Sequence, residues 1–403
     1  MNVFPFALLM ICLPLGTGLQ SLATTICTFF LLISRRGHIK NLPQFFTSGE
    51  KLSHVLLLAV IVLPLFATLL NLKNPEDDVL SNFLGFIPLV LLPCLFVISR
   101  PVPRENFRKI ELGWTVIMSL WMVAVITQHL WGWKIQGVEI VRGMSYTRSQ
   151  GFYSHPLTLA YVALMLWPFH LVLLCYRPRA VGRYILVIAN LSLLYYSASR
   201  TAQVVAVIAT LGFTLSYFRG RTRGILIGIM ALGVLGIFTT DNMISKRFLS
   251  MKTQISEEKE SDYPDDRIAF WIVHWNMVKE RPLLGHGINL NREYRMPYYQ
   301  AIGLRGFKKA YEAHNQLLQI AAEGGLMAAA AFLAWLGSLH YNWKNGPRAL
   351  KHIRDLTILC LLIGGLTQNA YFDGEVRYAI MTLFALMYAF RLNRQTSELP
   401  THE

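Results

Sequence analysis

The chain has 403 residues, of which 54% are hydrophobic and only 15% charged, and its formal net charge is +15. Ordinary soluble domains carry about 25% charged residues, so this composition excludes a conventional soluble fold of two or three domains. In a soluble protein the positive charge would suggest nucleic acid as a partner. Here the cations lie in loops between apolar runs, which indicates membrane topology and no nucleic acid.

The apolar runs predict transmembrane helices, because a run of about 18 residues or more spans the hydrocarbon core. The first run opens without a basic region or a cleavage site, so we expect a retained membrane segment and not a signal peptide. We predict an all-α polytopic membrane protein of about 12 transmembrane helices, near residues 3–17, 19–34, 52–72, 80–99, 111–131, 156–176, 181–198, 201–218, 222–240, 314–340, 355–371 and 378–391. One long kinked helix is the alternative for the first two, since Pro14, Gly16 and Gly18 interrupt that run.

Three parts follow from this pattern. Residues 1–240 hold helices 1–9 with a medium loop near 132–155, residues 241–313 form one large loop, and residues 314–403 hold helices 10–12 and a short tail. Within the large loop, Ile268–Val278 has the pattern of an amphipathic helix that lies against the membrane face.

The cations of the short loops fall mainly on one side of the membrane. The richer set of loops clusters them near residues 35–51, 100–109, 177–183, 219–223, 344–354 and 391–394. The other set holds only Lys73, Lys134, Arg142, Arg148, Arg200 and Arg377. The positive-inside rule puts the richer set and both termini in the cytoplasm, and the large loop outside.

Several chemistries lack their signatures in this sequence. The five cysteines all lie in apolar runs and show no disulfide or metal spacing. No phosphate-binding loop or dinucleotide turn occurs, and Asp265-Asp266 is a weak metal candidate. We therefore expect neither a metal nor a cofactor.

Three arginines and one histidine stand at the outer ends of predicted helices: Arg148, Arg200, Arg267 and His314. Any one arginine there often only reaches toward lipid headgroups, and a histidine at a helix start is more often a surface or capping residue. Together, however, three guanidiniums on the cation-poor side suit a lipid-linked phosphate or pyrophosphate. His314 at a helix start would take a proton from a hydroxyl as a general base.

Two further clusters allow a structural or a functional interpretation. Asp373, Glu375 and Arg377 crowd the last outer turn, where mutual pairing is slightly favoured over a role in binding. His286, in Pro282-Leu-Leu-Gly-His-Gly287, is expected to be structural.

These residues resemble the O-antigen ligase and polymerase superfamily of bacterial inner-membrane glycosyltransferases. The strongest likeness is His314-Asn315, nine residues and then Gly325. The stretches Arg148…Gly151-Phe…Pro156, Ser199-Arg200 and Arg267…Trp271…Pro282…Gly285-x-Gly287 follow the family pattern in order and spacing. The resemblance runs from about residue 140 to residue 380.

The resemblance implies an O-antigen ligase with its active site on the periplasmic face of the inner membrane, and one large periplasmic loop containing short helices. The donor would be a polysaccharide on undecaprenyl pyrophosphate, and the acceptor lipid A–core. His314 would be the general base, Arg200 and Arg267 would also be catalytic, and the reaction would invert the sugar without a metal. The implied substrate-binding residues are Arg148, Gln150, Tyr153, Asn315, Asp373 and Arg377.

Three alternatives stay open at this point. An O-antigen polymerase would use the same donor with a second lipid-linked glycan as acceptor, and it tends to have two large outer loops. A protein O-oligosaccharyltransferase usually carries an extra outer domain. A transporter or flippase of lipid-linked glycan would place charges near the bilayer midplane, whereas here they lie at helix ends.

Overall fold

The computed structural model describes residues 4–34, 48–70, 104–133, 148–176, 180–240, 266–288, 292–303, 311–342, 346–371 and 373–392, with single residues at 178, 242, 244 and 245. These parts of the chain form helices and loops and no β-strand. The helices are α1 (Phe4–Cys12), α2 (Thr17–Ser34), α4 (Ser48–Leu70), α7 (Arg104–Trp131), α8 (Pro156–Tyr176), α9 (Val181–Tyr196), α10 (Arg200–Tyr217), α11 (Gly220–Thr239), α13 (Asp266–Glu280), α14 (Arg292–Ala301), α15 (Gln316–Asn342), α16 (Arg348–Gly365) and α17 (Gly374–Leu392).

Every predicted helix that falls within these ranges is present, and the one expected at 80–99 lies outside them. The first two segments form two helices and not one kinked helix, because the chain turns between Cys12 and Thr17, where Pro14 cannot donate a helical hydrogen bond. The helix expected at 355–371 is shifted toward the N-terminus. It begins at Arg348, directly after Pro347, and ends at Gly365.

The all-helical architecture with long apolar helices agrees with a polytopic membrane protein. Five helices of the described chain are long and apolar enough to span a membrane, at Lys51–Leu70, Arg108–Trp131, Pro156–Tyr176, Gly220–Thr239 and Gln316–Tyr341. Shorter apolar helices lie at Gly18–Ile33 and Val181–Tyr196. The total of about 12 spans stays a prediction from apolar runs.

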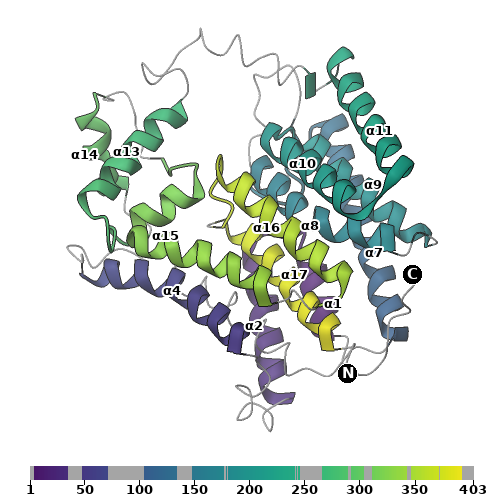
Figure 1. Ribbon diagram of the computed structural model, residues 1–403, viewed down its shortest axis with the longest axis horizontal. Helices are drawn as coiled ribbons and strands as arrows, with labels where there is room; N and C mark the ends of the chain where they lie inside the picture. Colours follow the sequence, from purple (N-terminus) through teal and green to yellow (C-terminus); the bar gives the residue numbers. More distant parts are fainter. Residues whose placement is uncertain are drawn as a thin grey trace.

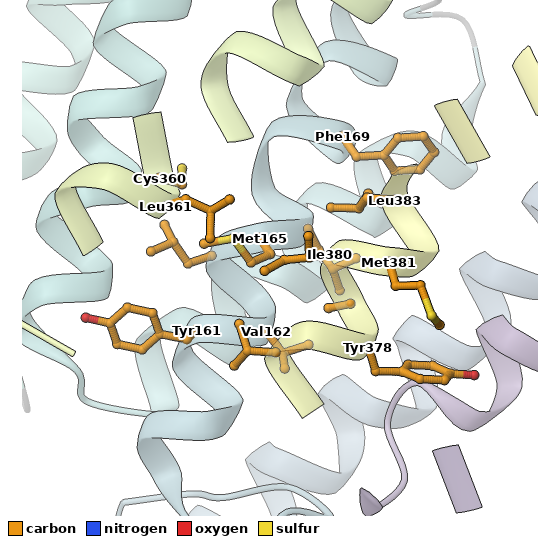
Figure 2. Close-up of a cluster of buried hydrophobic side chains, with 14 of the residues drawn as sticks. Tyr161, Val162, Met165, Phe169, Cys360, Leu361, Tyr378, Ile380, Met381 and Leu383 are labelled. Atoms are coloured by element: carbon orange, nitrogen blue, oxygen red, sulfur yellow. The ribbon is translucent and has the colours of Figure 1, made fainter. Parts of the chain in front are cut away.

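Helix α8 is the centre of the bundle. It packs against α9, α10, α16 and α17, and most of its membrane-length segment is buried. A helix that is apolar on every side has this place in a bundle. Figure 2 shows its side chains meeting those of two partners, with Tyr161 and Met165 facing Leu361 of α16 and Ile380 of α17. By contrast, α11 packs mainly on α10, and within the described chain none of its residues is buried.

Helix α15 lies along α4 and is kinked near its beginning (Figure 1). The kink is at Gly325, whose φ of 74° and ψ of 178° fit no other residue easily. A Cβ at this position would lie 1.9 Å from the carbonyl oxygen of Leu283, so the absence of a side chain also permits close contact. The small residues here serve close packing.

The turn at residues 282–288 forms hydrogen bonds with backbone groups of α15 whose regular helical bonds are interrupted by the kink. The N–H of His286 donates to Ala322 O at 2.9 Å and that of Gly287 to Glu323 O at 2.8 Å. In the reverse direction, Leu326 N–H donates to Pro282 O at 2.7 Å. His286 itself is buried, with Nε2 2.9 Å from Met277 O. Its predicted structural role is confirmed.

Helices α13 and α14 form a small layer beside the start of α15 (Figure 1). Its core consists of Ala269, Phe270, Val273, Met277, Val278, Tyr299, Ala321 and Ala322. The predicted helix at 268–278 is therefore present as part of α13. Its opposite edge leaves Ile268, Trp271 and Trp275 exposed.

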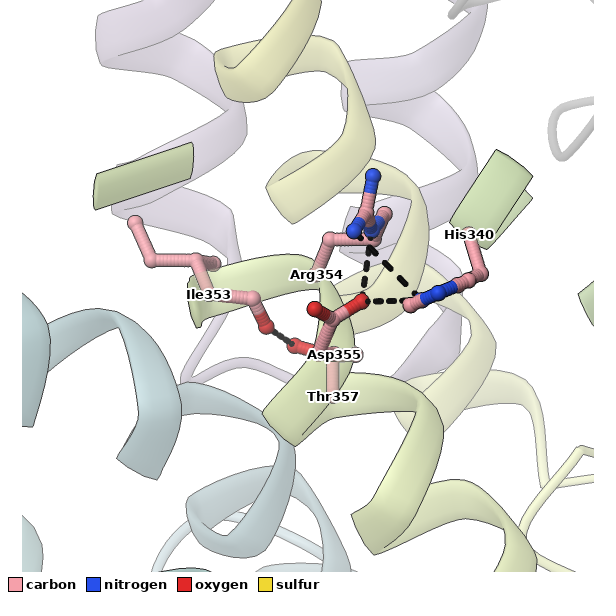
Figure 3. Close-up of polar contacts among 5 residues, drawn as sticks. All are labelled: His340, Ile353, Arg354, Asp355 and Thr357. Atoms are coloured by element: carbon pink, nitrogen blue, oxygen red, sulfur yellow. Dashed lines mark hydrogen bonds and ion pairs between the residues drawn. The ribbon is translucent and has the colours of Figure 1, made fainter. Parts of the chain in front are cut away.

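The far end of α15 carries a separate polar cluster (Figure 3). His340 Nδ1 lies 2.9 Å from Asp355 Oδ1, and Arg354 Nε–H donates to the same oxygen at 2.7 Å. Since α15 has 27 residues, this cluster and His314 lie at opposite ends of it.

Candidate functional site

His314 directly precedes the N-cap of α15. The cap is Asn315, whose Oδ1 accepts the N–H of Leu318 at 3.1 Å, and the helix begins at Gln316. The prediction that His314 opens the helix is thus wrong by two residues. Its backbone is left-handed, with φ of 47°, because the chain must turn sharply before the cap. The imidazole consequently projects from the helix end.

Two side chains hold the imidazole of His314. Its Nδ1 lies 3.0 Å from Oε1 of Gln368, in the turn between α16 and α17. Its ring also packs against Phe270 of α13, with centroids 5.6 Å apart. Because an amide oxygen only accepts, the proton of a neutral His314 belongs on Nδ1. Nε2 then presents a lone pair to the half-exposed surroundings.

The backbone on both sides of His314 is fixed as well. The N–H of Ala313 donates to Gln319 Oε1 at 2.9 Å, and the N–H of Tyr371 donates to Gln316 Oε1 at 2.8 Å. Both glutamine side chains come from the first turns of α15 and are buried. Through these hydrogen bonds, α15 holds both the segment that precedes it, at Ala313, and the segment that precedes α17, at Tyr371.

Asp373 joins α17 to α8. Its Oδ1 accepts the N–H groups of Glu375 and Val376 at 3.1 and 3.2 Å, so it caps α17. Its Oδ2 accepts the hydroxyl of Thr158, in the first turn of α8, at 2.7 Å. The carboxylate is thus already engaged by the protein, and this favours a positioning role over direct substrate binding.

Arg148 lies beside the turn that carries Arg200. Its Nε–H donates to the carbonyl of Ser197 at 3.0 Å, and Ser149 N–H donates to Tyr196 O at 2.9 Å. Ser197 is three residues before Arg200, the first residue of α10. The structure therefore brings these two predicted arginines to the same place.

Gln150 and Tyr153 are buried, which the sequence did not indicate. Tyr153 donates to the carbonyl of Leu13 at 2.5 Å. Burial and the nearby carboxylates of Glu375 and Asp373 raise the pKa of the Tyr153 hydroxyl well above its usual value. The N–H of Gln150 donates to Gln128 Oε1 at 2.9 Å. In this structure both side chains are therefore buried in the protein and do not line the surface of the loop.

Tyr161 of α8 interacts with the start of α10 and with Arg267 of α13. The Tyr161 hydroxyl donates to the carbonyl of Gly364 at 3.1 Å. It also interacts with Thr201, next to Arg200, and electrostatically with Arg267. Arg267 is one turn before Phe270 on α13, and Phe270 touches His314. The segments that carry the three residues expected to be catalytic therefore lie around Tyr161 and Phe270.

Several helices begin at this site, and each presents its partly positive end. They are α8 at Pro156, α10 at Arg200, α13 at Asp266, α15 at Gln316 and α17 at Gly374. The partial positive charge at helix starts favours anions. Converging helix starts with arginines between them are suited to a ligand with several negative oxygens.

Arg377 is half-buried in the first turn of α17. It interacts electrostatically with Tyr371, Asp373 and Glu375. This agrees with mutual pairing in the last turn, which the sequence slightly favoured over substrate binding.

The sequence reasoning missed His155, Thr158, Tyr161 and Gln368. His155 precedes α8 and is exposed, and it interacts electrostatically with Arg148, Asp373 and His314. The surrounding protein still partly desolvates the imidazole, and this desolvation, together with the charge of Arg148, lowers its pKa. Sequence position could have predicted two of these residues, because His155 and Thr158 flank the start of an outer helix, as the predicted site residues do.

Comparison with known families gives one finding. Residues 185–333 match the family model described as O-antigen ligase. The matched segment is less than half of the chain and includes Arg200, Arg267, His314 and Asn315. A comparison with curated proteins found no match.

Proposed function

We propose that the chain is an O-antigen ligase of the O-antigen ligase and polymerase superfamily, and the match of residues 185–333 to the O-antigen ligase family model supports this proposal. It transfers a polysaccharide from undecaprenyl pyrophosphate to lipid A–core. The superfamily consists of glycosyltransferase-like enzymes that act on lipid-linked glycans, which agrees with the apolar helices around the site. The choice of the ligase over the polymerase rests on the single large loop expected between residues 241 and 313.

His314 is the proposed general base, and its contact with Gln368 is the observation that carries this role. With Nδ1 held at 3.0 Å from Gln368 Oε1, Nε2 is the nitrogen left to take a proton. The acceptor hydroxyl attacks the anomeric carbon of the donor sugar while its proton passes to Nε2. A new carbon–oxygen bond forms on one face as the bond to the pyrophosphate breaks on the other. Single displacement inverts the configuration.

Arg148, Arg200 and Arg267 are the proposed ligands of the pyrophosphate. Their guanidiniums bind phosphate oxygens in pairs and offset the charge that grows on the leaving group. The helix starts at Pro156, Arg200 and Asp266 add partial positive charge at the same place. In this scheme Asn315 and Asp373 hold the site together through helix caps, while Gln150, Tyr153 and Arg377 support it.

The proposed orientation puts the His314 end of α15 in the periplasm of the bacterial inner membrane and both termini in the cytoplasm. Its support is the charge of the opposite end, where Arg348, Lys351 and Arg354 follow α15. The cluster of His340, Arg354 and Asp355 in Figure 3 would then lie at the cytoplasmic face.

Transfer by purified protein tests the proposal. Wild type, His314→Ala and, as a matched control, His340→Ala receive undecaprenyl-pyrophosphate glycan and lipid A–core. His340 is exposed at the other end of the same helix. We expect glycan on lipid A–core with wild type and His340→Ala only. Longer lipid-linked glycan without a lipid A–core product would identify a polymerase, and no product of either kind would favour a transporter.

A further inference from the structure

A second imidazole, that of His155, lies at the site in the loop before α8. It occupies the position directly before Pro156, the first residue of α8, and it is exposed. Thr158, three residues later, donates to Asp373 at 2.7 Å, so the start of α8 faces the cap of α17. Arg148 precedes His155 in the same loop and is anchored on Ser197, near Arg200.

The hydrogen bonds fix which nitrogen of His155 carries a proton. The backbone N–H of Leu157 donates to His155 Nδ1 at 3.0 Å. A backbone N–H can only donate, so Nδ1 holds a lone pair and the proton of the ring lies on Nε2. This arrangement is the reverse of that in His314, where Nδ1 carries the proton.

The charged groups around His155 are those of the proposed donor site. Arg148, Asp373 and His314 interact with it electrostatically. Partial desolvation by the surrounding protein lowers the pKa of the imidazole, and Arg148 and His314 act in the same direction, against Asp373. The lowered pKa favours a neutral imidazole, whose Nε2–H is a hydrogen-bond donor close to the cation of Arg148.

We propose that His155 is a further substrate-contacting residue of this site: its Nε2–H donates a hydrogen bond to a phosphoryl oxygen of the donor's pyrophosphate. This assignment rests on the proposed function. The site then contains two complementary imidazoles, since His314 accepts a proton from the nucleophile and His155 donates a hydrogen bond to the leaving group. The bond strengthens as negative charge grows on that oxygen, so it lowers the barrier as well as aiding binding.

The test measures binding of undecaprenyl pyrophosphate to full-length protein in detergent, with undecaprenyl monophosphate as the comparison ligand. His155→Ala removes the donor, whereas His155→Gln keeps an N–H near the position of Nε2. We expect Ala to weaken pyrophosphate binding by about 10- to 100-fold, and Gln to recover most of the loss. His340→Ala serves as the matched control and should bind as wild type does.

Steady-state transfer provides the second measurement. His155→Ala should lower kcat/KM for the donor at least as much as it weakens binding, with KM for the acceptor unchanged. Unaltered pyrophosphate binding in correctly folded His155→Ala, or a change in acceptor KM alone, would overturn the assignment.

The binding arm also separates the two proposals. If wild type binds undecaprenyl pyrophosphate but extends lipid-linked glycan, the ligase fails and the role of His155 stands. If wild type does not bind undecaprenyl pyrophosphate, both fail.

Discussion

Nδ1 of His314 lies 3.0 Å from Oε1 of Gln368, although the two residues are 54 positions apart in the chain. The contact determines which nitrogen of the imidazole can take part in proton transfer. An amide oxygen requires Nδ1 to be the donor, so only Nε2 remains for proton transfer. The left-handed backbone of His314 and its contact with Phe270 keep the ring in this orientation.

Gln368 should therefore control catalysis through His314. Gln368→Leu removes the acceptor, lets the imidazole rotate or change tautomer, and should lower kcat by about 10- to 100-fold. Gln368→Glu retains an acceptor and adds negative charge, which favours the imidazolium. Its activity should persist and its acid limb in a pH–rate profile should move to higher pH. Equal kcat in wild type and Gln368→Leu would remove this residue from the mechanism.

Arg200 and Arg267 should tolerate lysine poorly. A lysine keeps the charge but loses the planar fork that binds two phosphate oxygens at once. We expect each Ala variant to lower kcat/KM for the donor by about 100-fold or more, with little recovery in Lys. Arg221→Ala is the matched control, because Arg221 is exposed in the first turn of α11. Full activity in the Lys variants would indicate a requirement for charge alone.

Transfer should not depend on a divalent metal, because the proposed scheme assigns charge compensation to arginines and helix starts. Wild type treated with EDTA, and then dialysed, should retain its rate. The control is a parallel sample to which Mg²⁺ is restored. Loss of activity with chelator and its return with Mg²⁺ would refute the metal-free scheme.

The sequence predicted the helices well, since long apolar runs have few alternatives in a membrane. It also predicted the residues that belong to short local patterns, such as His314-Asn315 and Ser199-Arg200. It did not predict partners that depend on tertiary contact. Gln368, Tyr161 and His155 become part of the site only when α8, α15 and α16 pack together.

Burial explains the remaining differences at the site. Gln150 and Tyr153 lie in a polar stretch next to Arg148, which suggested contact with substrate. The structure instead buries both side chains: the Tyr153 hydroxyl reaches Leu13 after α1, and the backbone N–H of Gln150 donates to Gln128 of α7. Side-chain direction in an irregular loop follows from hydrogen bonds such as that of Gln128, and no periodic pattern in the sequence encodes it.

Gly325 should tolerate no side chain. Alanine there combines a backbone conformation that is nearly exclusive to glycine with a Cβ 1.9 Å from Leu283 O. We expect a loss of about 3 kcal/mol or more of unfolding free energy, seen as a lower Tm in detergent. Gly337→Ala in the same helix is the control, because nothing lies within 4 Å of its Cβ and its backbone is helical. Similar Tm values for the two variants would contradict the kinked geometry.

His274 should make the protein sensitive to acid. The residue is fully buried on α13, where Nδ1–H donates to Phe270 O at 2.8 Å, and burial lowers its pKa from 6.5 to about 3. As pH falls below 6.5 the unfolded chain binds a proton at this position and the folded chain does not, so stability decreases. Between pH 7 and pH 5 the loss is about 2 kcal/mol. His274→Phe removes this titration, and its Tm should fall less over that interval than the Tm of wild type or of His340→Phe. Parallel pH curves for wild type and His274→Phe would show that the buried imidazole does not carry the acid sensitivity.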